Sequence, residues 1–230
     1  MLLIQWLYLK NLAYWFQRFH TLTMPENLHK LFVISSPSGG GKTSLINKLF
    51  EDSRSSNFEK SISDTSRQKR EGDIEGKDYY FLSKKDFKEK IQKDEYVEYA
   101  TVFQNFYGTS KEEVKTKFKN SNLVLELDWQ GAYSLKKIYD DAKLIFLVPP
   151  SLKDLKKRLI KRNLDSPETI EKRLSEAKKE ISKSERYDFL VLNDDFDKAF
   201  EDLSQILFES ILLSDFNSRV PKDLIKRLVE

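Results

Sequence analysis

The chain has 230 residues, of which 39% are hydrophobic and 13% aromatic, so it holds enough apolar material for a packed core and is not wholly disordered. It has no cysteine and two histidines, which excludes disulfide scaffolds, thiolate metal sites and cysteine nucleophiles and argues against histidine triads. The formal net charge of +3, from 40 basic and 37 acidic residues, is too balanced for a general nucleic-acid-binding protein.

The N-terminal segment, residues 1–23, is rich in apolar and aromatic side chains, but Lys10 interrupts the run. A membrane-spanning helix needs about 20 apolar residues. A signal peptide needs a basic start and a small-residue cleavage site, and neither is present. An amphipathic helix on a membrane surface stays open as an alternative. We expect residues 1–23 to be an extension upstream of the true start at Met24, and residues 24–230 to form the folded domain.

A glycine-rich loop follows the first predicted strand. Residues 31–35 are a continuous apolar run, typical of a strand buried on both faces. Residues 36–43 read SPSGGGKT and fit the pattern G-x-x-x-x-G-K-[ST], except that Ser36 replaces the first glycine. Such a loop surrounds phosphates with backbone N–H groups at a helix N-terminus. The sequence therefore predicts a nucleoside triphosphate site, with Lys42 on the β- and γ-phosphates and Thr43 on magnesium.

Strands and helices alternate along the rest of the chain. Apolar runs at 123–127, 144–148 and 189–192 predict buried strands, and apolar stripes at helical spacing occur at 152–159, 170–181 and 200–211. This alternation predicts an α/β fold in which a parallel sheet of the P-loop NTPase type is flanked by helices. The predicted core comprises residues 31–57, 120–150 and 187–213. Residues 58–119 predict an inserted mixed-β subdomain, and residues 151–186 a basic helical excursion.

From residue 31 to about 213, the chain resembles guanylate kinase, the enzyme that transfers phosphate from ATP to GMP. The resemblance depends on segments that occur in the family's order. They are SSPSGGGKTS (35–44), SDTSRQKREGDIEGKDYYF (63–81), EYATVFQNFYGTS (98–110), LELDWQGA (125–132) and VLNDDFDKA (191–199). Together they are far more specific than the loop alone. The resemblance implies that residues 58–119 bind GMP and that residues 151–186 form a lid.

The family residues that bind GMP have counterparts here. The family holds the GMP phosphate with two arginines and two tyrosines, which fall on Arg67, Arg70, Tyr79 and Tyr107. A family glutamate accepts the adjacent N1–H and amino donors of guanine. That glutamate falls on Glu98. Two family hydroxyls that contact the base fall on Ser63 and Thr109, and a family aspartate near guanine and the metal falls on Asp128. The sequence leaves both roles of Asp128 open.

The resemblance also implies the ATP site and the mechanism. The family's lid arginines fall on Arg162 and Arg173, and Asn193 falls where the family approaches adenine. Lys42, Arg67, Arg162 and Arg173 are therefore the predicted catalytic residues, whereas we expect Arg158 to be solvated. The acceptor phosphate is already a nucleophile, so in-line transfer needs no general base and no covalent intermediate. The predicted ATP-binding residues are Ser36, Pro37, Ser38, Gly39, Gly40, Gly41, Lys42, Thr43, Ser44 and Asn193.

Four positions depart from the family's usual pattern. Lys69 replaces a proline, Asp73 a glutamate and Asn163 a glycine, and Glu126 is the first acid of a D-x-D pair. None of them removes a type of charge. We therefore expect changes in fine geometry and rate rather than loss of activity.

Two other functions were weighed. A related P-loop kinase of a phosphorylated ribose shares the loop and the lid, but it needs no carboxylate for guanine. A non-catalytic guanylate-kinase-like module typically lacks the loop lysine, which is present here as Lys42. The resemblance implies ATP with Mg²⁺ as donor, GMP and dGMP as acceptors, no nucleic acid and no stable membrane association. It implies a cytoplasmic location, because nucleotide pools are intracellular, and it leaves monomer and homo-oligomer open.

Overall fold

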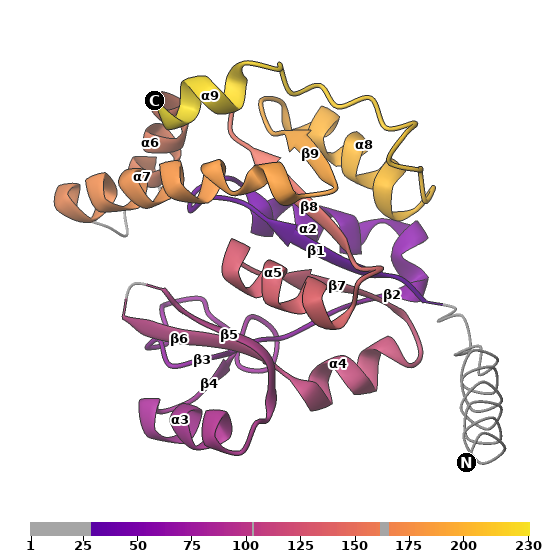
Figure 1. The fold of residues 1–230 in the computed structure, drawn as a ribbon. Helices are drawn as coiled ribbons and strands as arrows, with labels where there is room; N and C mark the ends of the chain where they lie inside the picture. The colour runs from indigo at the N-terminus through magenta and orange to yellow at the C-terminus, as the bar shows by residue number, and fades with distance from the viewer. Residues whose placement is uncertain (1–28, 103, 162–165) are drawn as a thin grey trace, which may run out of the picture.

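The computed structural model describes residues 29–102, 104–161 and 166–230 (Figure 1). The predicted extension 1–23 and the start at Met24 lie outside the described residues. A five-stranded sheet in the order β2-β7-β1-β8-β9 forms the core, and all of its neighbouring strands are parallel. Its strands are β1 (Leu31–Ser35), β2 (Phe58–Lys60), β7 (Asn122–Glu126), β8 (Lys143–Val148) and β9 (Phe189–Leu192). This confirms the predicted parallel sheet.

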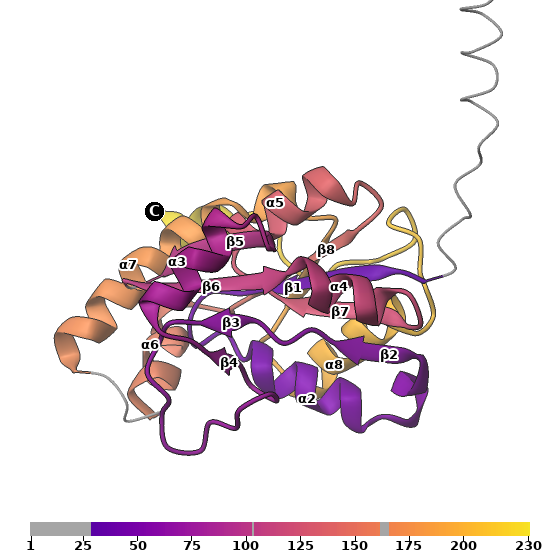
Figure 2. The same cartoon turned by 90° about the horizontal axis from the view of Figure 1, so that it is seen from below.

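Helices cover both faces of this sheet (Figures 1 and 2). On one face, apolar residues of α2 (Lys42–Glu51) and α8 (Phe196–Leu207) pack against the sheet. On the other face the packing comes from α4 (Lys111–Phe118), α5 (Trp129–Ile138), α7 (Pro167–Ser182) and α9 (Leu224–Val229). Burial of continuous apolar strands between two helical layers is the main stabilising contribution.

The predicted insert contains a second sheet of four strands, in the order β4-β3-β6-β5. They are β3 (Asp64–Thr65), β4 (Tyr80–Phe81), β5 (Tyr96–Val102) and β6 (Asn105–Ser110), with α3 (Lys84–Gln92) between β4 and β5. Strands β3 and β4 are parallel and the other pairs antiparallel, so this sheet is mixed. Phe87 of α3 is fully buried and stacks on Tyr96 and Phe106, which closes a small separate core.

Two details differ from the sequence prediction. Residues 58–60, assigned to the insert, form β2 and pair with β7 in the core sheet. The stripe at 200–211 is not one helix, because α8 ends at Leu207. Ile211 still packs against the same apolar cluster, from the segment after the helix. Apolar spacing alone did not distinguish a continuing helix from a loop that folds back.

The remaining elements are α6 (Leu152–Lys161) and two 3-10 turns (Ser53–Asn57 and Ser184–Arg186). Ser166 caps α7 and Pro167 occupies its first turn, as the sequence predicts. Within the described ranges, no helix combines the length and apolar character needed to cross a membrane.

The four-stranded sheet holds a buried charge whose removal we expect to destabilise it. Asp64 is buried, and its Oδ2 lies 2.5 Å from Lys90 Nζ and 2.7 Å from the Tyr96 hydroxyl that donates to it. Burial, and then this bond to Asp64, raises the pKa of Tyr96, so the hydroxyl stays a donor. Asp64→Ala leaves both partners without their acceptor and should lower the free energy of unfolding by about 2–3 kcal/mol, measured by urea denaturation.

The matched control is Glu89→Ala. Glu89 is exposed on α3 and lies 3.9 Å from Lys85, a contact of the kind that contributes little. We expect a change within about 0.5 kcal/mol. An equally small change for Asp64→Ala would contradict a stabilising role for the buried charge.

Candidate active site

The phosphate loop connects the end of β1 to the start of α2. Gly39 and Gly41 have φ values of 83° and 89°, in the left-handed region where L side chains are strained. The Gly40 N–H donates to the Pro37 carbonyl at 2.8 Å, which closes the turn. Ser36 is not among the described residues with positive φ, so serine fits where the usual pattern has glycine. The loop has the backbone curvature that an anion site requires.

Asn193 packs directly on this loop. Its Nδ2 donates to the Gly40 carbonyl at 2.6 Å, and a Cβ added to Gly41 would lie 2.5 Å from that nitrogen. Arg158 of α6 donates from Nη2 to the Asn193 carbonyl at 2.9 Å. The prediction that Arg158 is solvated is therefore wrong: it is half-buried and connects α6 to the end of β9.

A carboxylate noted above only as a departure from the family pattern lies beside the phosphate loop. Glu126 ends β7 and accepts a hydrogen bond from the Thr43 hydroxyl at 2.9 Å. Its other oxygen lies 3.1 Å from Lys60 Nζ, and Lys42 Nζ lies 3.9 Å from the first. Lys42 also donates to the Leu127 carbonyl at 3.3 Å. Burial alone would raise the pKa of Glu126, but the two lysines outweigh it and hold the pKa below its ordinary value.

The second sheet and the turn beside it bring one arginine and two tyrosines together. Arg67 Nη1 donates to Asp73 Oδ2 at 2.8 Å, and the Arg67 guanidinium lies over the Tyr79 ring at 5.4 Å. The rings of Tyr79 and Tyr107 meet edge to face, with centroids 5.8 Å apart. Asp73, noted as one methylene shorter than usual, thus orients Arg67. The Arg67 cluster therefore combines a guanidinium, paired with one carboxylate, and two phenol side chains.

Arg70 is placed differently from the rest of this cluster. Its backbone N–H donates to Asp73 Oδ2 at 2.7 Å, and its side chain is exposed. The structure therefore brings Arg67, Tyr79 and Tyr107 into contact and leaves the Arg70 guanidinium at the solvent edge of the same turn.

Glu98 is a buried carboxylate of the second sheet. It lies on β5, is only 6% exposed, and pairs in register with Thr109 of β6. The hydroxyls of Ser63 and Thr109 lie 3.3 Å apart. Burial raises the pKa of Glu98 to about 7, and the charge of Asp128 adds to this shift. Asp128 itself caps α5, with Oδ1 accepting the Gly131 N–H at 2.9 Å.

Two residues of α7 lie near the phosphate loop. Arg173 Nη1 donates to the Ser38 hydroxyl at 3.0 Å. Glu180 lies two turns further along α7 and is close enough for the charge of Lys42 to act on its carboxylate. Burial raises the pKa of Glu180 to about 7, against the opposing charge of Lys42. Arg162, the other predicted lid arginine, lies outside the described residues.

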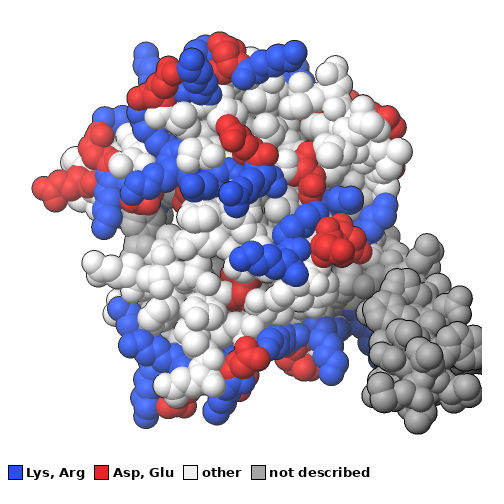
Figure 3. All heavy atoms as spheres, viewed as in Figure 1, with Lys and Arg blue, Asp and Glu red and all other residues white. Residues whose placement is uncertain are grey.

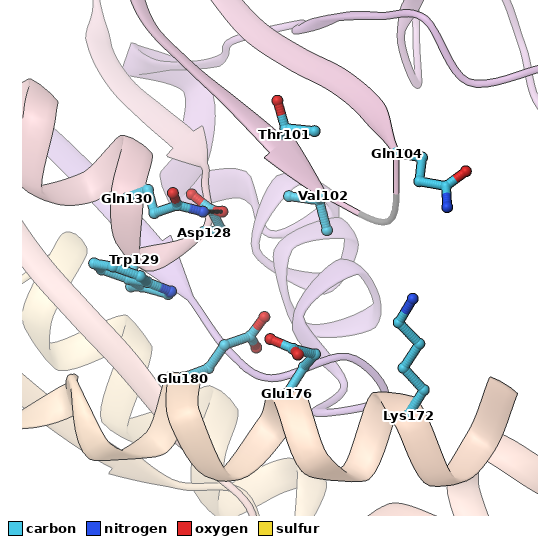
Figure 4. A pocket seen from close by; sticks show the side chains of 9 residues that line it. All are labelled: Thr101, Val102, Gln104, Asp128, Trp129, Gln130, Lys172, Glu176 and Glu180. Atoms are coloured by element: carbon cyan, nitrogen blue, oxygen red, sulfur yellow. Dashed lines mark hydrogen bonds between the residues drawn. The ribbon is translucent and has the colours of Figure 1, made fainter. Parts of the chain in front are cut away.

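Of these residues, Asp128 and Glu180 line a cavity of about 280 Å³ between the end of β5, the start of α5 and one face of α7. In Figure 4, Glu176 and Glu180 project from α7 toward the cavity, and Asp128 and Gln130 face it from α5. On the face drawn in Figure 3, the described Lys and Arg side chains are interspersed with Asp and Glu. Charge at the site therefore comes from individually placed residues.

Three residues near the site, Glu126, Lys60 and Glu180, are not among the predicted site residues. The D-x-D pattern was a signal for Glu126. No pattern in the sequence indicated Lys60 or Glu180. The contacts of Lys60 depend on the order of the strands, and those of Glu180 depend on the orientation of α7.

Comparisons with known proteins agree with this geometry. The guanylate kinase family model matches residues 28–210. A guanylate kinase from Wolbachia is 46% identical over 184 residues, which cover 79% of this chain and 93% of that protein. One from Haemophilus influenzae is 42% identical over 201 residues, or 86% of this chain and 97% of that protein.

A solved structure is similar over nearly the whole chain. The crystal structure of guanylate kinase from Anaplasma phagocytophilum superposes with a TM-score of 0.66 at 31% identity, and covers 89% of this chain and 98% of its own. Identity at this level over most of both chains, together with the family match, establishes common ancestry and a shared fold. The chain belongs to the guanylate kinase family.

Proposed function

We propose that this chain transfers the γ-phosphoryl group of ATP to GMP, yielding ADP and GDP, with the phosphate loop as the donor site and the Arg67 cluster as the acceptor site. One observation supports this arrangement above the others. Burial raises the pKa of Tyr79, and the next largest contribution is the charge of Glu126, which itself contacts Thr43 of the loop. The charge of Glu126 thus acts both on the proposed acceptor tyrosine and on Thr43 of the proposed donor loop.

On the donor side, we assign the triphosphate to the loop N–H groups and to Lys42. The Thr43 hydroxyl and the Glu126 carboxylate, 2.9 Å apart, are hard oxygen donors of the kind that suits Mg²⁺. Bound there with the nucleotide phosphates, Mg²⁺ would neutralise charge on the transferred group. Asp128 is a second candidate near the metal or the base. Asn193 and Arg158 order the loop at its adenine side.

On the acceptor side, we assign the GMP phosphate to Arg67, Tyr79 and Tyr107, with Arg70 closing on it from the solvent edge. Glu98 accepts the paired donors of guanine, supported by the hydroxyls of Ser63 and Thr109. An oxygen of the GMP phosphate attacks the γ-phosphoryl group in line. The residues around it therefore position the substrates and neutralise charge, and none of them has to remove a proton. Because none of these contacts requires the ribose 2′-hydroxyl, dGMP is also proposed as a substrate.

We further propose that the insert after β2, residues 61–119, acts as the GMP-binding unit and residues 151–186 as a lid whose Arg173, with Arg162, closes over the phosphates. Lid closure would exclude water and so limit ATP hydrolysis. The nucleotide substrates favour a cytoplasmic location. Neither alternative function is favoured, since the relatives named above are guanylate kinases.

The direct test is an ATP-dependent assay that offers GMP, dGMP, AMP, UMP and a ribose phosphate as acceptors. We expect GMP and dGMP to be preferred. Preferential phosphorylation of a ribose phosphate would support the related-kinase alternative. Absence of transfer, with GMP still bound, would support the non-catalytic module.

The raised pKa of Glu98 predicts how GMP binding depends on pH. Guanine presents two N–H donors, so it binds the ionised carboxylate, and a pKa of about 7 means that most of the carboxylate is ionised at pH 8 and little at pH 6. GMP affinity should therefore be lost as the pH falls through 7. We expect the KM for GMP, at saturating ATP, to rise about tenfold between pH 8 and pH 6.

Glu98→Gln is the control, because it removes this titration and retains the shape of the side chain. Its remaining pH dependence measures the titration of the GMP phosphate, whose second pKa lies near 6. An unchanged pH profile in this variant would show that Glu98 does not bind the base.

A further inference from the structure

Gly131 lies in the first turn of α5, where its backbone does not require glycine. The described glycines with positive φ are Gly39, Gly41, Gly72 and Gly76, so Gly131 has a conformation open to any L residue. Glycine is among the least favourable residues in a helix. Its presence within Trp129–Ile138 therefore has a cause other than backbone conformation.

Glycine at position 131 leaves space for the carboxylate of Glu98. A Cβ built on Gly131 would lie 2.5 Å from Glu98 Oε2 and 3.1 Å from Glu98 Cδ. The next nearest atom, Leu127 Cβ, would lie at 3.4 Å, which is ordinary van der Waals contact. Heavy-atom contacts of a real Cβ are essentially never under 3.0 Å, so a methyl group here must displace the Glu98 carboxylate by at least about 0.5 Å.

The displaced group is the free end of a flexible side chain, whereas the helix backbone around Gly131 is fixed by its own bonds. The Gly131 N–H is held by Asp128 Oδ1 at 2.9 Å, and a Cβ does not interfere with that bond. The methyl group should therefore move the carboxylate and leave the fold intact.

We propose that Gly131 is a positioning residue that sets the guanine selectivity of the acceptor site, by leaving room for the Glu98 carboxylate against the first turn of α5. This inference rests on the proposed function of Glu98 as the acceptor for guanine. Both carboxylate oxygens must meet two adjacent N–H groups at hydrogen-bonding distance. Misplacement of a binding group by about 1 Å can reduce rates by about 10²-fold.

The test is Gly131→Ala, assayed with GMP and with inosine monophosphate, the analogue that lacks the 2-amino donor. We expect kcat/KM for GMP to fall about 10- to 100-fold, mainly through KM, and the preference for GMP over inosine monophosphate to fall about tenfold. The KM for ATP should be unchanged. The thermal midpoint should be retained or raised, because alanine favours the helix.

Two matched variants separate positioning from a structural effect. Ser134→Ala changes the same helix one turn further along and should leave the GMP preference unchanged. Glu98→Asp shortens the acid, so Gly131→Ala added to that background should cost less than about twofold. The same loss in both backgrounds, or an unaltered GMP preference in Gly131→Ala, would overturn the inference.

The remaining outcomes also support or contradict the inference. If Gly131→Ala fails to fold and the double variant with Glu98→Asp folds, the collision with Glu98 is supported; if both fail, the essential contact lies elsewhere and the inference is wrong. If Glu98→Gln itself keeps the preference for GMP over inosine monophosphate, the proposed base recognition fails, whatever Gly131→Ala does.

Discussion

Replacement of Lys42 by alanine is expected to lower kcat by about 10³-fold, equivalent to about 4 kcal/mol of transition-state stabilisation, with GMP binding largely retained. Lys42 begins α2, and its Nζ lies 3.3 Å from the Leu127 carbonyl and 3.9 Å from Glu126 Oε1. A triphosphate in the loop would bring its β- and γ-oxygens to this ammonium group, where charge develops during transfer. Steady-state kinetics and GMP titration on the same variant measure the two quantities separately.

Lys48→Ala is the matched control on the same helix. Lys48 lies on the exposed side of α2, 4.0 Å from Glu51, and should give wild-type kcat. Turnover of Lys42→Ala within tenfold of the wild-type protein would contradict the assignment of the donor site.

Arg67→Ala is expected to lower kcat/KM for GMP by about 10²- to 10³-fold without altering ATP binding. The guanidinium is oriented by Asp73 at 2.8 Å and lies over Tyr79, so it presents its remaining N–H groups in a fixed direction. Hydrogen bonds between such a group and a phosphate are charge-assisted and among the stronger polar contacts in proteins. The measurement is the dependence of rate on GMP concentration at saturating ATP.

Two comparisons make this result specific. Arg67→Lys keeps the charge but loses the planar fork, so it should recover only part of the activity. Arg227→Ala removes an exposed arginine of α9, paired with Asp223 at 3.0 Å, and should leave the kinetics unchanged. Equal KM values for GMP in Arg67→Ala and the wild-type protein would place the acceptor phosphate elsewhere.

The phosphate loop and the parallel core could be predicted from the sequence because local signals specify them. Glycines before a lysine at a strand-to-helix junction have few other structural uses, and continuous apolar runs require burial on both faces. The acceptor residues came from the family's motifs, and the structure brings Arg67, Tyr79 and Tyr107 into contact. Their proposed roles in binding remain predictions for the experiments above.

Contacts set by strand order could not be predicted in this way. Lys60 pairs in register with Val124, so its side chain lies near Glu126, two residues further along the same face of β7. The two charges are separated by more than sixty positions in the sequence, and only the parallel pairing of β2 with β7 brings them together.

The orientation of a helix about its own axis could not be predicted from the sequence either. The lysine-rich α7 has a solvated face, as expected, but Glu180 lies at the border of its apolar stripe and projects toward the cavity (Figure 4). Arg158 looked like another solvated residue, and its hydrogen bond to the Asn193 carbonyl depends on how α6 packs against the end of β9.

The hydrogen bond between Arg173 and the Ser38 hydroxyl has a consequence for how nucleotide enters the proposed donor site. Arg173 of α7 already contacts the loop, 3.0 Å from Ser38 Oγ. A phosphate in the loop would offer this guanidinium a charged acceptor in place of a neutral hydroxyl, and the charge-assisted bond is the stronger of the two. Occupancy of the loop and the position of α7 are, on this chemistry, one linked equilibrium.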